Sequence, residues 1–250
     1  MDYINFEKPC HIYFMGIGGI SMSGFAHLLH EAGFTISGSD MKQSTITHGL
    51  EEKGIHINYS QVGSNINSDI DLVVYTAAIH PDNEEYIAAK ALNIPMIDRA
   101  EMVGQVMKHY STAIGISGTH GKTTTTSMLS HVFLEGDMDP TISVGGILKA
   151  INSNIRIGKS ENFITEACEY TNSFLKFFPT VEIILNIEED HMDFFKDLED
   201  IRNSFRKYAN LLPDNGILVI NGEIENHEAI TRECKGRVVT YGTDSTDYTY

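Results

Sequence analysis

The sequence predicts an α/β protein with two parallel-sheet domains, one after the other. Short apolar, β-branched runs alternate with helical patterns along its 250 residues, as in strands joined by crossover helices. Two glycine-rich turns, "MGIGGISMSG" at 15–24 and "GISGTHGKTTTTS" at 115–127, each follow such a strand and precede a helix. One glycine-rich turn would serve a single ligand, so the presence of two calls for an explanation.

The first series of elements predicts a Rossmann-like domain. Its last helix is followed by a new strand in polar surroundings, so we place the boundary near 107–110 and assign 1–108 to this domain. Strands are expected at 11–16, 34–40, 71–78 and 94–97, and helices at 21–33, from about Pro81-Asp82, and at 99–110.

The second series predicts another α/β domain over 109–250. Strands are expected at 111–117, 162–167, 181–187 and 216–221, and a helix at 121–135. The stretch 196–212 is an amphipathic helix, because its apolar residues recur at helical spacing. These residues are Leu198, Ile201, Phe205, Tyr208 and Leu212.

Composition excludes several classes of protein. The formal net charge of −16 argues against nonspecific nucleic-acid binding, which needs clustered basic residues. No apolar run approaches the roughly 20 residues of a membrane span, and the N-terminus does not resemble a secretory signal. Cys10, Cys168 and Cys234 lie far apart, which argues against a disulfide framework or a structural zinc site. We therefore expect a soluble, cytoplasmic protein.

The first glycine turn is suited to a phosphate. Gly16, Gly18 and Gly19 would let the backbone approach a ligand and aim helix amides at it. Asp40, at the end of the next strand, is placed to contact a ribose hydroxyl. Ser21 stands where a dinucleotide fingerprint has its third glycine, which weakens NAD as the ligand. A tight turn without a ligand stays open.

The second glycine turn, Gly118-Thr119-His120-Gly121-Lys122-Thr123-Thr124, resembles a P-loop. Backbone amides would cradle phosphate oxygens, Lys122 would reach the β- and γ-phosphates, and the Thr123 hydroxyl would bind Mg²⁺. Ile116 stands where the strict P-loop pattern has its first glycine. The sequence therefore matches only the shorter core of that pattern, which ends in Gly121-Lys122-Thr123. A helix start without a ligand is the alternative.

Acidic residues and a histidine follow two later strands. Glu166 ends the strand at 162–167, and His191 follows the strand at 181–187. Ligands collect at this edge of open α/β sheets, and a nucleotide-bound metal needs oxygen ligands. Glu169, Glu188, Glu189, Asp190 and Asp193 lie nearby in the sequence. We interpret Glu188, Glu189 and Asp193 as a solvated rim.

Seven stretches, taken in order, resemble the Mur ligase family. They are "GIGGISMSGFA" (16–26), "GSD" (38–40), "YTAAIHPDNEE" (75–85), "RAEM" (99–102), "GTHGKTTTT" (118–126), "EACEYTNSFL" (166–175) and "NIEEDHMDFF" (186–195). The resemblance implies an ATP-dependent ligase of peptidoglycan precursor synthesis, which joins L-alanine to the carboxylate of UDP-N-acetylmuramate through an acyl phosphate. It also explains the two turns, one for the UDP-sugar and one for ATP.

The resemblance implies roles for particular residues. The UDP-sugar would bind at Gly16, Ile17, Gly18, Gly19, Ile20, Ser21, Ser39, Asp40, Thr76 and Ala77. ATP would bind at Gly118, Thr119, His120, Gly121, Lys122, Thr123 and Thr124. Lys122, Glu166 and His191 would be catalytic, Thr123, Glu166 and His191 would hold Mg²⁺, and Asn186 would position nucleotide or substrate.

The chain departs from the family pattern in two respects. Cys168 and Thr171 stand where family members often carry acids. The sequence also ends at Tyr250, before the amino-acid domain and with an incomplete central domain, so we expect a fragment that is inactive alone. No nucleic-acid partner and no membrane insertion are expected, and a homodimer stays open.

Other functions stay open at this point. A murein-peptide recycling ligase uses the same sugar, but "GIGGISMSG" favours the alanine-adding reaction. An NAD-dependent oxidoreductase would explain the first turn only. A nucleotide-binding regulator without catalysis would leave Thr123, Glu166 and His191 without a chemical task.

Overall fold

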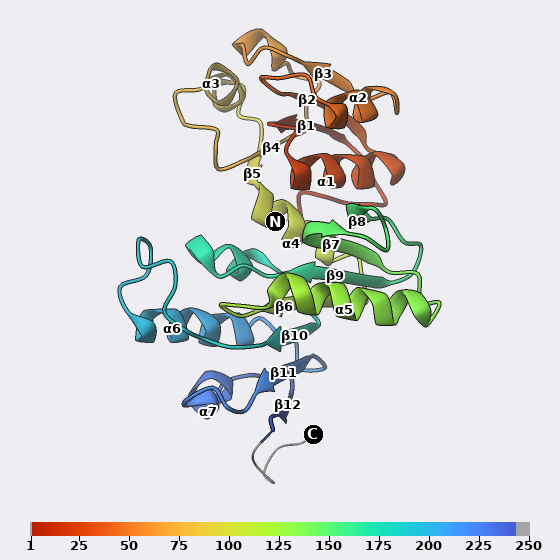
Figure 1. The fold of residues 1–250 in the computed structure, drawn as a ribbon. Coiled ribbons are helices and arrows are strands. Elements are labelled where there is room, and N and C mark those ends of the chain that lie inside the picture. Colours follow the sequence, from red (N-terminus) through yellow and green to blue (C-terminus); the bar gives the residue numbers. More distant parts are fainter. Residues whose placement is uncertain (1, 244–250) are drawn as a thin grey trace. The chain divides into compact units, whose positions relative to one another are not determined.

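The structure is a computed structural model that describes residues 2–243. The chain divides into two compact units, Met1–Val106 and Met107–Tyr250, and each is built on a sheet of its own (Figure 1). The α/β class expected from the sequence is confirmed.

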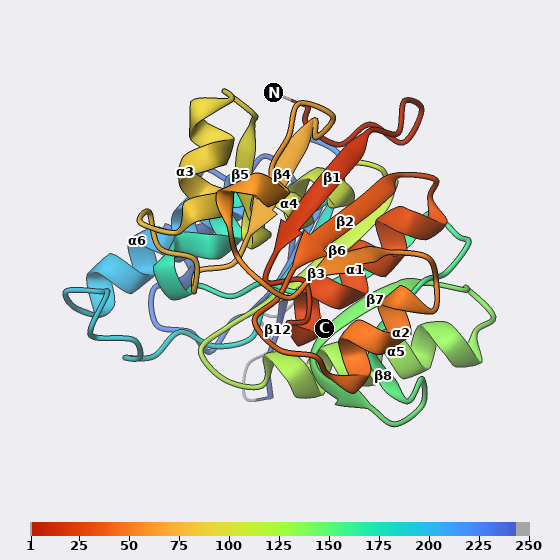
Figure 2. The same cartoon turned by 90° about the horizontal axis from the view of Figure 1, so that it is seen from above.

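The first unit contains five parallel strands in the order β3-β2-β1-β4-β5, which lie side by side in Figure 2. The order reverses between β1 and β4, and ligands of open α/β sheets bind at the carboxyl ends of strands at such a point. The strands are β1 (His11–Met15), β2 (Thr35–Ser39), β3 (His56–Asn58), β4 (Leu72–Tyr75) and β5 (Met96–Asp98). The helices are α1 (Ile20–Glu31), α2 (Thr45–Glu51), η1 (Gly63–Asn65), α3 (Glu84–Ala91) and α4 (Arg99–Met107).

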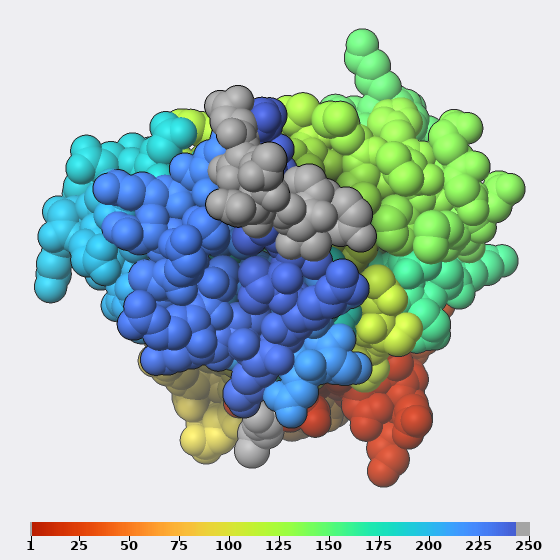
Figure 3. Space-filling view, turned by 90° about the horizontal axis from the view of Figure 1, so that it is seen from below, coloured from red at the N-terminus to blue at the C-terminus, as the bar shows by residue number. Residues whose placement is uncertain are grey.

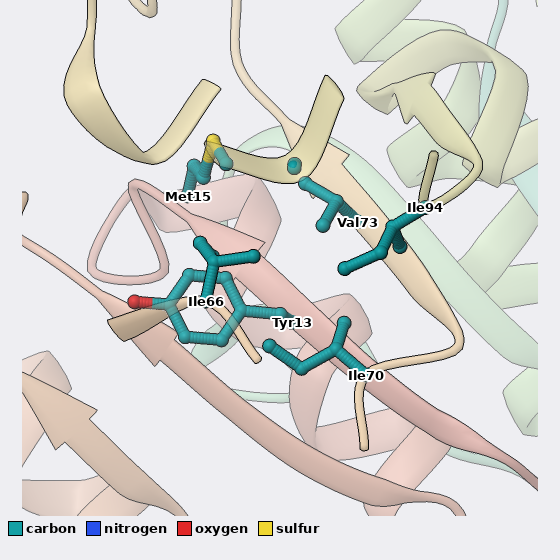
Figure 4. Close-up of a cluster of buried hydrophobic side chains, with 7 residues drawn as sticks. Tyr13, Met15, Ile66, Ile70, Val73 and Ile94 are labelled. Carbon is teal, nitrogen blue, oxygen red and sulfur yellow. The ribbon is translucent and has the colours of Figure 1, made fainter. Parts of the chain in front are cut away.

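Strand β1 is buried on both faces, as a central parallel strand requires. Figure 4 shows Tyr13 and Met15 on one face, packed with side chains from β4 and the surrounding loops. This cluster consists of Tyr13, Met15, Ile66, Ile70, Val73, Ala89 and Ile94. Burial of these side chains stabilises the strand that leads into the first glycine turn.

A buried carboxylate is fully paired beside this cluster. Glu85 has no exposed surface. It accepts hydrogen bonds from the Tyr13 hydroxyl at 2.7 Å, from the Ser39 hydroxyl at 2.6 Å and from the Asn65 amide at 2.7 Å. These bonds offset the cost of removing the carboxylate from water, and they tie β1, β2 and η1 to α3.

The second unit contains seven strands in the order β12-β11-β10-β6-β9-β7-β8. All neighbouring pairs are parallel except β7 with β8. In Figure 3 the blue atoms of β11, α7 and β12 form much of the visible face of this unit. The strands are β6 (Thr112–Ser117), β7 (Thr141–Leu148), β8 (Ser153–Arg156), β9 (Asn162–Glu166), β10 (Val181–Ile184), β11 (Ile217–Asn221) and β12 (Arg237–Tyr241). The helices are α5 (Lys122–Glu135), η2 (Tyr170–Lys176), α6 (Leu198–Ala209) and α7 (His227–Thr231).

Two helices pack on opposite faces of this sheet. Leu129 and Phe133 of α5 lie against Ile114 and Ile116 of β6. Side chains of a strand alternate between faces, so Gly115 belongs to the other face, where it lies against the Tyr208 hydroxyl of α6. Strand β6 is therefore covered on both faces.

Several elements have weak sequence signals. Strands β7 and β8 were not expected, because Gly145-Gly146 and the Asn-Ser run at 152–154 interrupt the apolar pattern. Helix α2 begins with a capping box between Ser44 and Thr47, and β3 has three residues. The helix expected from Pro81-Asp82 starts at Glu84, because the Asn83 side chain accepts the first free amides.

Two neighbouring polar groups in the core of the second unit, Glu182 and Tyr208, are buried without a hydrogen-bond partner within residues 2–243. Glu182 of β10 has no exposed surface. Neither its carboxylate oxygens nor the buried Tyr208 hydroxyl has a hydrogen-bond partner among the described residues. Burial raises the pKa of Glu182 well above its usual value, since a charge is costly in an apolar surrounding. The nearby Tyr208 hydroxyl and Cys234 thiol also have raised pKa values, chiefly through burial.

We predict that Glu182→Gln stabilises the protein at neutral pH. The raised folded-state pKa means that the folded chain keeps a proton that the unfolded chain releases above its ordinary carboxyl pKa. Wild-type stability should therefore fall with rising pH by up to about 1.4 kcal/mol per unit. Urea unfolding at pH 4.5 and pH 7.5 measures the effect. The variant should gain over wild type only at pH 7.5, and an equal difference at both values contradicts the prediction.

Candidate functional site

The first glycine turn joins β1 to α1 and is fixed by backbone hydrogen bonds. Gly16 has φ of +80°, a conformation that favours glycine. The amides of Gly16 and Ile17 donate to the Ser39 carbonyl oxygen at 2.9 and 3.0 Å. Helix α1 starts after Gly19 without a side-chain cap. Its first amides are thus positioned to bind an anion.

Asp40 braces this turn. Its carboxylate accepts the Gly18 amide at 2.9 Å. A Cβ at Gly18 would lie 2.8 Å from the same carboxylate, so glycine permits this close approach. Ser39 is fully buried, and its hydroxyl donates to Glu85. The structure therefore directs the Ser39 side chain into the core and leaves only its backbone at the turn.

The other residues expected to bind a ligand at this turn lie near it but differ in how exposed their side chains are. Thr76 follows β4, and its side chain would be 3.3 Å from a Cβ at Gly16; Ala77 is exposed beside it. Ile17 is fully buried, whereas Ile20 is 59% exposed. These positions enclose the start of α1 at the carboxyl edge of β1 and β4.

Arg99 is a residue of this site to which sequence reasoning gave no role. Its guanidinium donates to the Ser21 hydroxyl over 3.4 Å, which places a positive charge beside the first turn of α1. Guanidinium groups pair well with phosphate oxygens. The only sequence evidence for such a role was the position of Arg99 in the motif "RAEM", and nothing in that motif marks the arginine as a ligand-binding residue.

The second glycine turn joins β6 to α5. Gly118 and Gly121 have φ of +138° and +85°, which a side chain would disfavour. Asn186, after β10, holds the loop: its Oδ1 accepts the His120 amide at 2.8 Å, and its amide group donates to the His120 carbonyl at 3.0 Å. The Asn186 carbonyl accepts the Thr119 amide at 3.2 Å.

Helix α5 begins directly after this loop without a side-chain cap. The loop amides of Thr119 and His120 already bind Asn186. A phosphate would therefore meet the amides at the start of the helix, from Lys122 through the exposed Thr124, where the helix dipole also favours negative charge.

The Lys122 side chain folds back over the loop. Its ammonium group donates to the carbonyl oxygens of Gly118 and Thr119 at 2.5 and 3.2 Å. It also contacts both carboxylate oxygens of Glu169, at 3.1 and 3.0 Å. The charged end of Lys122 thus lies against the backbone of the glycine loop.

Thr123 and Glu166 meet at the start of α5. The Thr123 hydroxyl donates to Glu166 Oε2 at 3.0 Å, and the Gly145 amide donates to Glu166 Oε1 at 2.6 Å. A Cβ at Gly145 would lie 2.9 Å from this carboxylate. Strand β7, which was not expected, therefore fixes the orientation of Glu166.

His191 lies beside Glu169 rather than beside Glu166. Its Nε2 is 3.9 Å from Glu169 Oε1, and its ring lies 4.5 Å from that of Tyr170, centroid to centroid. Glu169 is 2% exposed. Sequence analysis noted it only as a nearby acid, because nothing in "EACEYTNS" shows which acid turns inward.

The loops that carry these groups hold uncommon backbone conformations. Thr171, Asn172 and His191 have φ of 54°, 57° and 52°. Such conformations cost about 1–3 kcal/mol each and concentrate at functional sites. The Ser204 hydroxyl of α6 donates to the Asn172 side chain, which anchors the loop that places Glu169.

The donor set is suited in part to Mg²⁺. No three His, Cys, Asp or Glu side chains of residues 2–243 form a group that could hold a metal ion. The Thr123 hydroxyl and the Glu166 carboxylate offer two adjacent oxygen ligands, and Mg²⁺ typically takes one or two protein ligands together with phosphate oxygens and water. These two residues therefore fit the ion, whereas His191 is placed apart from them.

Comparison with known proteins gives two consecutive matches to family models. The model described as "Mur ligase family, catalytic domain" matches residues 11–111. The model described as "Mur ligase middle domain" matches residues 116–250.

Named relatives agree with these matches. UDP-N-acetylmuramate–L-alanine ligases of Agathobacter rectalis and Lachnoclostridium phytofermentans are 59% and 60% identical to this chain over 98% and 99% of its residues. The chain covers 53% of each relative, so it spans about half of their length.

Solved structures of the family have the same fold. The UDP-N-acetylmuramate:L-alanyl-γ-D-glutamyl-meso-diaminopimelate ligase of Neisseria meningitides matches with a TM-score of 0.83 and 28% identity, over 94% of this chain and 79% of that one. The UDP-N-acetylmuramate–alanine ligase of Thermotoga maritima matches with a TM-score of 0.76 and 29% identity, over 94% of this chain and 53% of that one. Because the two Mur ligase models match residues 11–111 and 116–250, which together are most of the chain, this chain belongs to the Mur ligase family.

Proposed function

We propose that this chain carries the UDP-sugar and ATP sites of a cytoplasmic ligase that joins L-alanine to UDP-N-acetylmuramate. The observation that carries the proposal is the meeting of Lys122, Thr123 and Glu166 at the start of α5. It supplies a cation for phosphates and two oxygen ligands for Mg²⁺ at one helix N-terminus. The high identity to alanine ligases supports the choice of substrate.

The second unit would bind ATP. The first amides of α5 would receive phosphate oxygens, and Lys122 would neutralise charge on the β- and γ-phosphates. Bound Mg²⁺ would supply further charge neutralisation at the same phosphates. Thr123 and Glu166 are the residues that would hold the ion, and His191 would hold a second one.

The first unit would bind UDP-N-acetylmuramate. The uncapped start of α1 and the guanidinium of Arg99 beside Ser21 form an anion site suited to the diphosphate. Asp40, fixed to the Gly18 amide through one oxygen, keeps acceptor capacity for a ribose hydroxyl.

The chemistry would proceed in two steps. The sugar carboxylate attacks the γ-phosphorus of ATP, which gives an acyl phosphate and ADP. The amine of L-alanine then attacks the acyl carbon, phosphate leaves, and an amide forms. Positioning and charge neutralisation account for such a reaction, so Lys122 and the helix amides suffice without a cysteine or serine nucleophile.

The competing functions have less support. The relatives that are 59–60% identical to this chain are alanine ligases, whereas the solved tripeptide-adding and alanine ligases are about equally similar to it, at 28% and 29% identity. An NAD-dependent oxidoreductase leaves the second glycine turn without a purpose. A regulator without catalysis leaves the Thr123–Glu166 pair unexplained.

We predict that calorimetric titration detects saturable binding of UDP-N-acetylmuramate and none of NADH. Arg99→Ala should weaken sugar-nucleotide binding about tenfold or more, because charge-assisted contacts to phosphate are lost. The matched control is Arg232→Ala, which removes the same charge from the second unit. NADH binding without UDP-sugar binding contradicts the role of the first turn.

We also predict that Lys122→Ala abolishes measurable MgATP binding and leaves UDP-N-acetylmuramate affinity within about twofold. The loss follows from removing the cation that would neutralise charge on the phosphates, and from leaving the buried Glu169 carboxylate without its cation beside them. Equal MgATP affinity of wild type and variant would refute the role of Lys122. In the full-length enzyme the same change should abolish ATP-dependent ligation.

A further inference from the structure

The ammonium group of Lys122 has no donor left for a phosphate. A lysine ammonium offers three donors. Here they are directed to the Gly118 carbonyl, the Thr119 carbonyl and the Glu169 carboxylate. A nucleotide that binds at the glycine loop must therefore displace at least one of these partners.

Glu169 is the partner that an incoming phosphate would displace. The two carbonyl oxygens belong to a loop fixed by Gly118 and by Asn186. Glu169 approaches instead from a separate segment, and it carries a negative charge. A carboxylate and a phosphate compete for the same cation, and they repel each other strongly where water is scarce.

Burial makes this competition effective. The Glu169 side chain is 2% exposed, and that of Lys122 is 16% exposed. A pair of this kind is screened little by salt. Removing one partner of a buried ion pair leaves the other uncompensated, so Glu169 needs another partner when Lys122 moves. His191, with Nε2 at 3.9 Å from Glu169 Oε1, is in place to provide it.

We propose that Glu169 is a positioning residue that holds Lys122 over the glycine loop at 118–121 and releases it when a nucleotide binds. The inference rests on the proposed ATP site. It goes beyond that site by giving the loop a built-in competitor, which keeps the lysine charge neutralised and oriented between binding events. Glu169 then keeps His191 as its remaining charged neighbour, with Nε2 at 3.9 Å from its Oε1.

The test compares MgATP affinity and nucleotide-free stability in Glu169→Gln. The amide keeps the size of the side chain and removes its charge. We expect the dissociation constant for MgATP to fall about tenfold, since the competitor is neutral. We expect the melting temperature without nucleotide to fall by several degrees, because a buried pair is broken. A purely structural residue would weaken stability and binding together.

Two further variants complete the experiment. Glu189→Gln removes the same charge from an exposed neighbour and should leave both quantities unchanged within about twofold. Glu169→Asp shortens the side chain by one methylene group, which moves the carboxylate away from Lys122, and it should tighten MgATP binding by a smaller factor than Glu169→Gln. If Glu169→Gln does not fold, the MgATP affinity of Glu169→Asp tests the role of Glu169 instead.

The outcomes separate this inference from the proposed function. Wild-type protein that binds no MgATP overturns both. Wild-type binding with unchanged or weaker affinity in Glu169→Gln and Glu169→Asp overturns the role of Glu169 alone. Tighter binding combined with a lower melting temperature supports it.

Discussion

The site of the second unit depends on the hydrogen bonds between Asn186 and the backbone of Thr119 and His120. These bonds tie the end of β10 to the loop between β6 and α5. Glycine at 118 and 121 lets the loop turn away from the strand, and Asn186 then fixes where it ends. Because the start of α5, Lys122 and Thr123 all follow from that position, a shift of the loop would displace every group that could face a phosphate.

Both units contain the same arrangement of a buried strand, a glycine turn and an uncapped helix start. In each, a buried strand leads through glycine at positive φ into a helix with no side-chain cap, so that backbone amides remain for an anion. Backbone amides at a helix start create a local positive potential. We therefore expect phosphate binding even though the chain has a net charge of −16. In each unit a carboxylate also lies close to the turn, Asp40 in the first and Glu169 in the second.

The sequence predicted the fold where the signal is local and repeated. Apolar runs such as 181–187 and the spacing of Phe205 and Tyr208 identify strands and helices without knowledge of their neighbours. Strand β7 was not predicted, because Gly145 and Gly146 interrupt its apolar pattern, and the long-range contact of Gly145 with the Glu166 carboxylate cannot be read from the sequence. Glu169 and Arg99 were missed for the same reason: their partners, Lys122 and Ser21, lie 47 and 78 residues away in the chain. Long-range contacts of single polar side chains leave no periodic pattern.

The most direct test of the account is a crystal structure of this chain with MgADP. We expect the β-phosphate on the first amides of α5, with the Lys122 ammonium turned toward it. We also expect the cation between the Thr123 hydroxyl and Glu166, with Asn186 still bound to His120. A nucleotide bound elsewhere, or one bound here while Lys122 stays on Glu169 and the Thr123–Glu166 hydrogen bond is intact, would contradict it.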